Sequence, residues 1–247
     1  MQARAQNQSL FNAYYLNRFV YNPATAATEY AQIFVHHRQQ WLGIEGAPVI
    51  SAVSINSMID NTRIGLGMKA STYKRGLLNS SDISFAYAYG IPVTKKSHLY
   101  FGLSGGAITH TVDVTNATDP DDPVFARYQA NNLQPTGSFG LLYQTQAGLN
   151  FGFILPQLFG PSFLDKSFSE IAVTPVDNMV ASIGYRKKLD GKMVTRRVKG
   201  MKTRVKATDV YAPLEMYVLY RYSSFTPGQF EAMGKLNLNS NVWVGAS

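Results

Sequence analysis

The stretch from Ile83 to Ile91 alternates strictly between large apolar and small side chains. Successive residues of a β-strand point to opposite faces, so one face of this strand carries Ile, Phe and Tyr, and the other carries Ser, Ala and Gly. The second face has no charged residue, although a strand of a soluble sheet normally presents charge to water. This pattern is typical of a barrel wall between lipid and lumen. We therefore predict an all-β chain that forms a transmembrane antiparallel β-barrel of the outer-membrane type.

The composition supports this interpretation. Only 15% of the residues are charged, whereas soluble domains contain about 25%. The chain also contains 15 Tyr and 14 Phe, which suit the surface of a barrel in lipid. No apolar run reaches about 18 residues, so no helical membrane span is expected, and a barrel is the remaining way to satisfy backbone groups in lipid.

The alternation recurs along the chain. We expect strands near residues 29–37, 49–55, 62–71, 83–91, 99–105, 137–145, 148–158, 179–187, 212–222, 230–238 and 241–245. The predicted short links are 56–61, 92–97 and 146–147, and the predicted long links are 72–80, 108–136 and 159–177. Outer-membrane barrels alternate short periplasmic turns with longer extracellular loops. The order of the links therefore predicts that the barrel begins in the periplasm.

The two ends of the chain differ from its middle. Residues 1–27 do not hold the alternation, and we expect a periplasmic, plug-like segment there, followed by a barrel domain at 28–247. Residues 1–6 lack the apolar stretch of a signal peptide, so we expect that a signal sequence was removed or lies upstream. Residues 241–247 stop within a strand pattern, and we expect the barrel to be incomplete at its C-terminus.

Positive charge is concentrated in one link. Residues 185–206 contain ten Lys or Arg and one acid and therefore carry +9, whereas the whole chain carries +8. By the order of the links this basic loop faces the periplasm, where it would meet an acidic partner or the cell wall; a solvated charge run is an equally good interpretation. No nucleic-acid partner is expected, because the loop lacks aromatic residues for base stacking between Lys187 and Lys206. The candidate contact residues are Lys192, Arg196, Arg197, Lys199, Lys202 and Arg204.

We expect no catalytic residue, cofactor or metal site. Asp119, Asp121 and Asp122 offer oxygen ligands for calcium, but the spacing of an EF-hand is absent, so a solvated loop is the preferred interpretation. His36 and His37 are adjacent on a predicted strand and would point to opposite faces. No serine lies in a G-x-S-x-G elbow. An enzyme whose site is assembled across strands would leave no motif, and we keep it as a minor alternative.

Two strings near the N-terminus are the most distinctive part of the sequence. The first comprises Phe11-Asn-Ala-Tyr14, Asn17 and Asn22-Pro-Ala24, and the second comprises Arg38-Gln-Gln-Trp41, Gly43 and Gly46-Ala-Pro48. They resemble motifs of the PorP/SprF family, which are outer-membrane proteins of type IX secretion and gliding motility in Bacteroidetes. Weaker matches lie at Gly65-Leu-Gly67, Asp122-Pro-Val-Phe125 and residues 152–158.

The chain departs from the family pattern in two places. It has Ala26-Ala27 where the family usually has Ala-Gly, so a flexible glycine is missing. Its basic insertion at 186–206 is longer than the resemblance leads us to expect.

The resemblance implies a non-enzymatic barrel of the bacterial outer membrane, with about 12–14 strands when complete. It implies that the barrel anchors a type IX-secreted surface protein through that protein's C-terminal domain, or links to other secretion or gliding components. An outer-membrane transporter or porin for small or hydrophobic molecules is the alternative, and a soluble β protein comes last. Small lumen-facing residues leave room for a polypeptide. The candidate partner-binding residues are Asn22, Pro23, Arg38, Gln39, Gln40, Trp41, Ser84, Ala86, Ala88 and Ser104.

Overall fold

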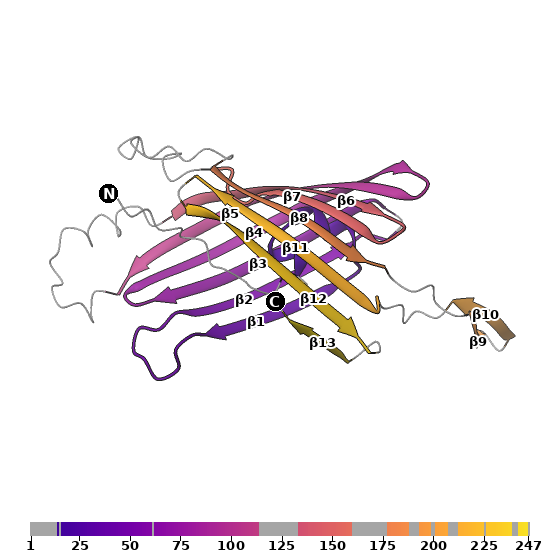
Figure 1. Ribbon diagram of the computed structural model, residues 1–247, viewed down its shortest axis with the longest axis horizontal. Helices are drawn as coiled ribbons and strands as arrows, with labels where there is room; N and C mark the ends of the chain where they lie inside the picture. Colours follow the sequence, from indigo (N-terminus) through magenta and orange to yellow (C-terminus); the bar gives the residue numbers. More distant parts are fainter. Residues whose placement is uncertain are drawn as a thin grey trace.

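One antiparallel sheet of eleven strands makes up most of the fold, and the prediction of an all-β chain is confirmed. The computed structural model describes residues 14, 16–60, 62–113, 133–159, 177–187, 193–198, 201–206, 212–224, 226–238 and 242–246. The sheet curves into a barrel-like wall that is not closed, with β1 and β13 as its two edges (Figure 1). Among the residues described, no helix is long and apolar enough to cross a membrane.

The strands of this sheet pair in sequence order, and each predicted strand overlaps an observed one. Only the hairpin within the basic link was not predicted; it consists of β9 (Met193–Val198) and β10 (Met201–Lys206). The sheet consists of β1 (Gln32–Gln39), β2 (Val49–Met58), β3 (Ile64–Arg75), β4 (Leu78–Thr94), β5 (Ser97–Val112), β6 (Leu133–Thr145), β7 (Leu149–Leu155), β8 (Asn178–Arg186), β11 (Leu214–Ser223), β12 (Thr226–Asn237) and β13 (Trp243–Ala246).

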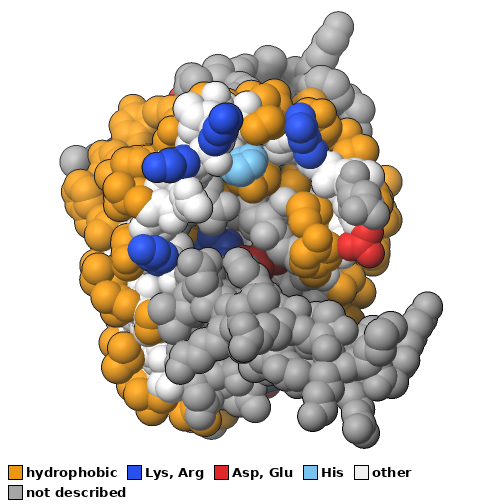
Figure 2. Space-filling view, turned by 90° about the vertical axis from the view of Figure 1, so that its right-hand side faces the viewer, with side chains coloured by type: hydrophobic (Ala, Val, Ile, Leu, Met, Phe, Trp, Pro, Cys, Tyr) orange, Lys and Arg blue, Asp and Glu red, His pale blue; other side chains and the backbone are white. Residues whose placement is uncertain are grey.

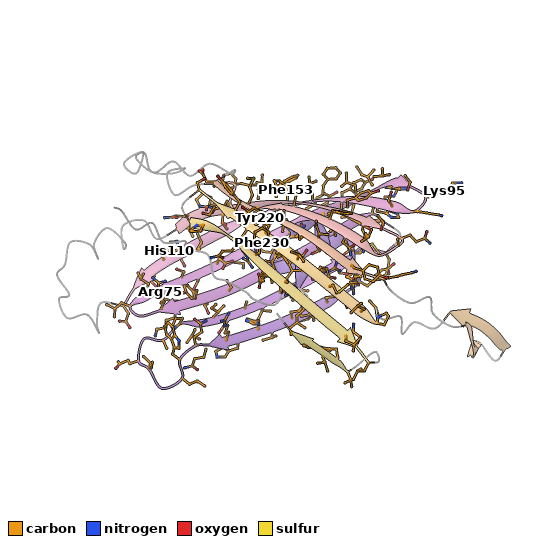
Figure 3. All side chains as sticks on the ribbon, in the orientation of Figure 1. Arg75, Lys95, His110, Phe153, Tyr220 and Phe230 are labelled. Carbon is orange, nitrogen blue, oxygen red and sulfur yellow. The ribbon has the colours of Figure 1, made fainter. Side chains whose placement is uncertain are left out.

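The barrel has two distinct ends. We call the end with the short connections at 59–63, 95–96 and 146–148 the turn end, and the opposite end, which carries residues 40–48, the loop end. Figure 3 labels Lys95 at the turn end, and Arg75 and His110 at the loop end.

The expected long link at 72–80 is wrong. β3 and β4 continue to Arg75 and Leu78, and their pairing includes Thr72 with Ser81. Only two residues are left for the turn. Gly76 there has a φ of 58°, a left-handed conformation that glycine adopts without steric penalty.

The two faces of the sheet have opposite chemistry, as the alternation at Ile83–Ile91 predicts. Phe85 and Tyr87 point outward and are 59% and 50% exposed, whereas the alternate side chains Ser84, Ala86 and Ala88 point inward and are buried. On the same outward face, the rings of Tyr220 and Phe230 lie 4.6 Å apart (Figure 3). Figure 2, which looks onto the turn end, shows hydrophobic side chains around the outside of the wall, and mostly basic side chains with an acidic one on its rim. Such an apolar outer surface suits lipid.

The described residues from Tyr14 to Glu29 lie inside this wall, and we call them the plug. They contain two short 3-10 helices, η1 (Arg18–Val20) and η2 (Pro23–Ala27). All residues of η2 are buried, and η2 contacts every strand from β2 to β6. In Figure 1 the plug appears as indigo turns behind the strands near the centre of the barrel.

Candidate functional site

Asn22 both shapes the plug and attaches it to the wall. Its side-chain oxygen accepts a hydrogen bond from the backbone N–H of Ala24 at 2.9 Å, which caps η2. Its Nδ2 donates to the carbonyl oxygen of Leu141 on β6 at 3.0 Å. An N-cap side chain satisfies a helix N–H group that has no partner within the helix, and Pro23 fits the first helical position because it has no N–H to satisfy. The Asn-Pro-Ala string is therefore a cap that also contacts the wall.

Asn17 repeats this arrangement one turn earlier. Its side-chain oxygen accepts from the backbone N–H of Val20 at 3.4 Å and caps η1. Its Nδ2 donates to Ser54 Oγ on β2 at 2.7 Å. Lys69 of β3 reaches the other end of η1, where its Nζ donates to the carbonyl oxygen of Val20 at 3.3 Å. Both asparagines of the motif thus join a plug turn to a strand.

The wall beneath η2 is built from glycine. A Cβ atom added to Gly65 would overlap the backbone of Ala26, and one added to Gly102 would overlap the backbone of Ala24. A Cβ atom on Gly140 would overlap the side chain of the η2 cap. The backbone of η2 can approach the sheet this closely only because these positions carry no side chain.

Two of the predicted partner-binding residues contact the plug itself. Ala86 and Ala88 of β4 are 7% and 0% exposed, and they share a buried cluster with Phe19 and η2 residues Ala26 and Ala27. In this structure their partner is therefore the N-terminal part of the same chain.

Tyr14 anchors the other side of the plug. It is 2% exposed, and its ring centroid lies 5.3 Å from those of both Tyr21 and Tyr217. It belongs to a buried cluster that includes Leu219 and Met233 of β11 and β12. Aromatic edge contacts of this kind add to the stability given by apolar burial.

Five charged residues join the plug to the turn end of the wall, and we call them the charged cluster. Within the plug, Arg18 Nη2 lies 3.2 Å from Glu29 Oε1, and Glu29 also forms an ion pair with Arg186 of β8. Arg186 Nε lies 3.0 Å from Glu215 Oε2 on β11, and Lys235 Nζ of β12 lies 3.8 Å from Glu215 Oε1. Because these side chains are at most 16% exposed, their attraction is less screened than that of surface pairs.

Arg18 stays positively charged within this cluster. Burial alone lowers the pKa of its guanidinium, but Tyr217 and Glu29 raise it, and the net pKa lies above the ordinary value. The plug therefore carries a permanent buried cation next to the wall.

A comparison with known families places this chain in one of them. The family model described as "Type IX secretion system membrane protein PorP/SprF" matches residues 3–247. The chain belongs to the PorP/SprF family. It is therefore a membrane protein with a role in type IX secretion, in association with other components of that system. No curated protein and no solved structure matches the chain.

On the loop-end side of the plug, the lumen of this PorP/SprF protein is lined by small polar side chains. Ser84 and Ser104, both predicted to face the lumen, are 3% and 7% exposed and lie on the loop-end side of Ala86 and Gly102. Ser104 Oγ lies 2.6 Å from Ser138 Oγ on β6. These serines form a surface separate from the charged cluster.

The string Arg38-Gln-Gln-Trp41 lies at the loop end, away from the plug. Arg38 and Gln39 end β1, and the backbone N–H of Gln40 donates to the carbonyl oxygen of Pro48 at 3.0 Å, which closes the loop. Trp41 is 67% exposed and has a φ of 51°. The two apolar side chains that follow it, Leu42 and Ile44, are 80% and 63% exposed. We call Trp41, Leu42 and Ile44 the apolar loop tip.

Four of the six basic candidates of the PorP/SprF protein lie on the strands of the hairpin. Arg196 and Arg197 lie on β9, Lys202 and Arg204 lie on β10, and Lys202 pairs with Arg197 in the ladder. Lys192 and Lys199 lie outside the described residues, as do the candidate calcium ligands Asp119, Asp121 and Asp122. Within the described ranges, no group of three His, Asp or Glu could hold a metal ion.

Sequence reasoning missed the charged cluster. Glu215 and Lys235 occupy inward positions of strands whose outward positions are apolar, and this break in the small-residue pattern was the available signal. Arg18 and Glu29 gave no such signal, because they belong to a segment without strand alternation.

Proposed function

We propose that this PorP/SprF protein is a non-enzymatic barrel of the outer membrane that anchors a type IX-secreted surface protein through the C-terminal domain of that protein. It would also link this cargo to the secretion or gliding machinery. The observation that carries the proposal is the filled lumen, because a barrel whose interior is occupied by its own chain is suited to binding rather than to conduction.

The contacts of the plug support binding over the alternative of a transporter. Asn22 is 0% exposed, and η2 lies directly on the glycine wall of β3, β5 and β6. A porin keeps a water-filled lumen. Passage of a small molecule through this barrel would require the plug to leave the wall and to break the ion pairs of the charged cluster.

The loop end is the proposed surface for the secreted partner. The turn end has three short connections, and the loop end has two-residue links at 76–77 and 224–225 besides its longer loops. Because outer-membrane barrels carry their longer loops outside and short turns in the periplasm, we propose that the loop end lies outside the cell. The apolar loop tip would then be exposed to the exterior, where contiguous apolar side chains mark an interaction site. Ser84 and Ser104 line the lumen on the same side of the plug.

The turn end is the proposed surface for an inner partner. Arg63, Lys95, Lys96 and Lys187 are exposed there together with one described acid, Asp60, and the β9–β10 hairpin follows β8 in the sequence at the same end. A face with an excess of one charge sign speeds and orients association with a partner of opposite charge. We therefore propose an acidic periplasmic component as the inner partner.

The test is affinity purification of the full-length protein from its native membrane in mild detergent, followed by quantitative mass spectrometry. We expect Trp41→Ser combined with Leu42→Ser to lose the secreted protein and to keep the inner partner. We expect replacement of four hairpin cations by Gln to do the reverse; the residues are Arg196, Arg197, Lys202 and Arg204. Leu149→Ser, at an exposed apolar position of the turn end, is the control for the loop variant.

Two results would contradict the proposal. Unchanged recovery of every partner by both variants would refute the assigned surfaces. Recovery of the barrel alone, together with steady conductance of the wild-type protein in a planar bilayer, would favour the transporter.

A further inference from the structure

A cavity of about 220 Å³ lies beside the plug at the seam between β1 and β13. The charged cluster lines it together with Trp243 of β13, and Gln32 and Phe34 of β1 complete the wall on the other side. Figure 2 shows acidic and basic side chains deep behind the rim of the turn end. A cavity lined by several charged groups and by the aromatic rings of Phe19, Phe34 and Trp243 has the chemistry of a binding site.

The carboxylates around this cavity are already paired. Glu29 contacts both Arg18 and Arg186. Glu215 contacts Arg186 and also accepts hydrogen bonds from Tyr217 OH at 3.2 Å and from the side-chain amide of Asn237 at 3.2 Å. Two carboxylates face three cations, so the cluster carries a net charge of +1.

Each of the three cations retains a donor that no described residue accepts in a hydrogen bond; for Arg186 it is Nε, although this atom lies 3.0 Å from Glu215 Oε2. Arg18 Nη1 is buried and has no hydrogen-bond partner within the described part of the chain, and the Arg18 side chain is only 9% exposed. Lys235 Nζ approaches Glu215 only to 3.8 Å, which is too long for a hydrogen bond, and lies 5.2 Å from the ring centroid of Trp243. Arg18 Nη1 is a buried donor of the kind that proteins normally satisfy, whereas Lys235 is 16% exposed and reaches the cavity from the wall.

We propose that this cavity binds a single carboxylate group, held by Arg18 Nη1 and Lys235 Nζ beside the ring of Trp243. The net charge of +1 matches one monovalent anion. A guanidinium edge fits the planar geometry of a carboxylate. A dianion is less suitable, because Glu29 and Glu215 flank the site. The carboxylate belongs either to a small organic acid or to an acidic residue of a peptide.

Trp243 supplies the readout. The chain has two Trp, so Trp41→Phe at the exposed loop tip leaves Trp243 as the only one. Full-chain protein folded in detergent is titrated with sodium acetate, with sodium chloride at equal ionic strength, and with the neutral analogue acetamide. We expect a saturable change in Trp243 fluorescence with acetate, and no such change with chloride or acetamide.

Short peptides distinguish the two sources of the carboxylate. A peptide with one Glu is compared with the same peptide carrying Gln. Saturation by acetate assigns the site to a small acid, and saturation by the Glu peptide alone assigns it to a peptide carboxylate. If none of the carboxylates gives a saturable change, or if chloride gives the same change as acetate, the proposal is wrong.

Variants test the assigned donors in the Trp41→Phe background. Arg18→Gln and Lys235→Gln should each weaken carboxylate binding at least about tenfold, which corresponds to the loss of one charged hydrogen bond. Arg63→Gln on the exposed rim is the matched control and should bind like the parent. The shift in gel mobility on heating checks that each variant is folded. If Arg18→Gln does not fold, Lys235→Gln carries the test, and unchanged binding by a folded variant would refute the site.

Discussion

Replacement of Asn22 by Ala should release the plug from the wall. The change removes the cap of η2 and the hydrogen bond to Leu141 while it leaves the barrel strands intact. Loss of an N-cap costs about 1 kcal/mol, and loss of a buried hydrogen bond costs about 1 kcal/mol more. The side chain is completely buried, so its lost packing adds to this sum. We expect a total of roughly 2–3 kcal/mol, which raises the undocked fraction about 30- to 140-fold.

Thiol labelling measures this fraction. Ser54 on β2 is 2% exposed beneath the plug, and Ser54→Cys introduces a nearly isosteric thiol at a site that water reaches only when the plug leaves. The labelling rate with a water-soluble maleimide is compared with and without Asn22→Ala in protein whose folding is checked by heat-dependent gel mobility. Asn79→Ala, at an outward-facing position of β4 near the loop end, is the matched control and should leave the rate unchanged. A rate increase below threefold for Asn22→Ala, or one equal to that of the control, would refute the proposed attachment.

Three further predictions test the wall. Gly102→Ala should raise the same labelling rate because its methyl group would overlap η2, whereas Gly105→Ala on the same strand has open space and should not. Phe85→Arg should reduce folding into lipid vesicles by about 2–4 kcal/mol if this face meets the bilayer centre, while Thr111→Arg beyond the apolar region should fold normally; equal yields would contradict the lipid-facing assignment. Arg186→Gln should lower the temperature at which the gel shift is lost, since removal of one buried partner costs about 3–5 kcal/mol; an unchanged temperature would show that the cluster adds no stability.

Strand positions were largely predictable because alternation is a local property. Ile83–Ile91 predicts both its strand and its facing, since each residue's side follows from that of its neighbour. The long link predicted at 72–80 is wrong because Gly76 allows a tight turn, and β3 and β4 stay paired beyond the apolar part of the sheet.

The candidate site was less predictable. The N-terminal motif was recognised as distinctive, but sequence could not show that Asn22 reaches Leu141, because the two residues are 119 positions apart and meet only when the sheet curves. Sequence alternation predicts small side chains in the lumen, and the structure adds that Gly65, Gly102 and Gly140 admit the plug.

The sequence by itself determined the strands, their lipid and lumen faces, and the family. Alternation of side chains and short motifs both depend only on residues that are close together in the sequence. Only the tertiary structure decided what occupies the lumen. Arg18 and Glu29 meet Arg186 and Glu215 because the wall brings β8 and β11 around the plug. Because these side chains are buried, the ion pairs are necessary: charged groups removed from water must find partners within the protein. No local pattern encodes that requirement.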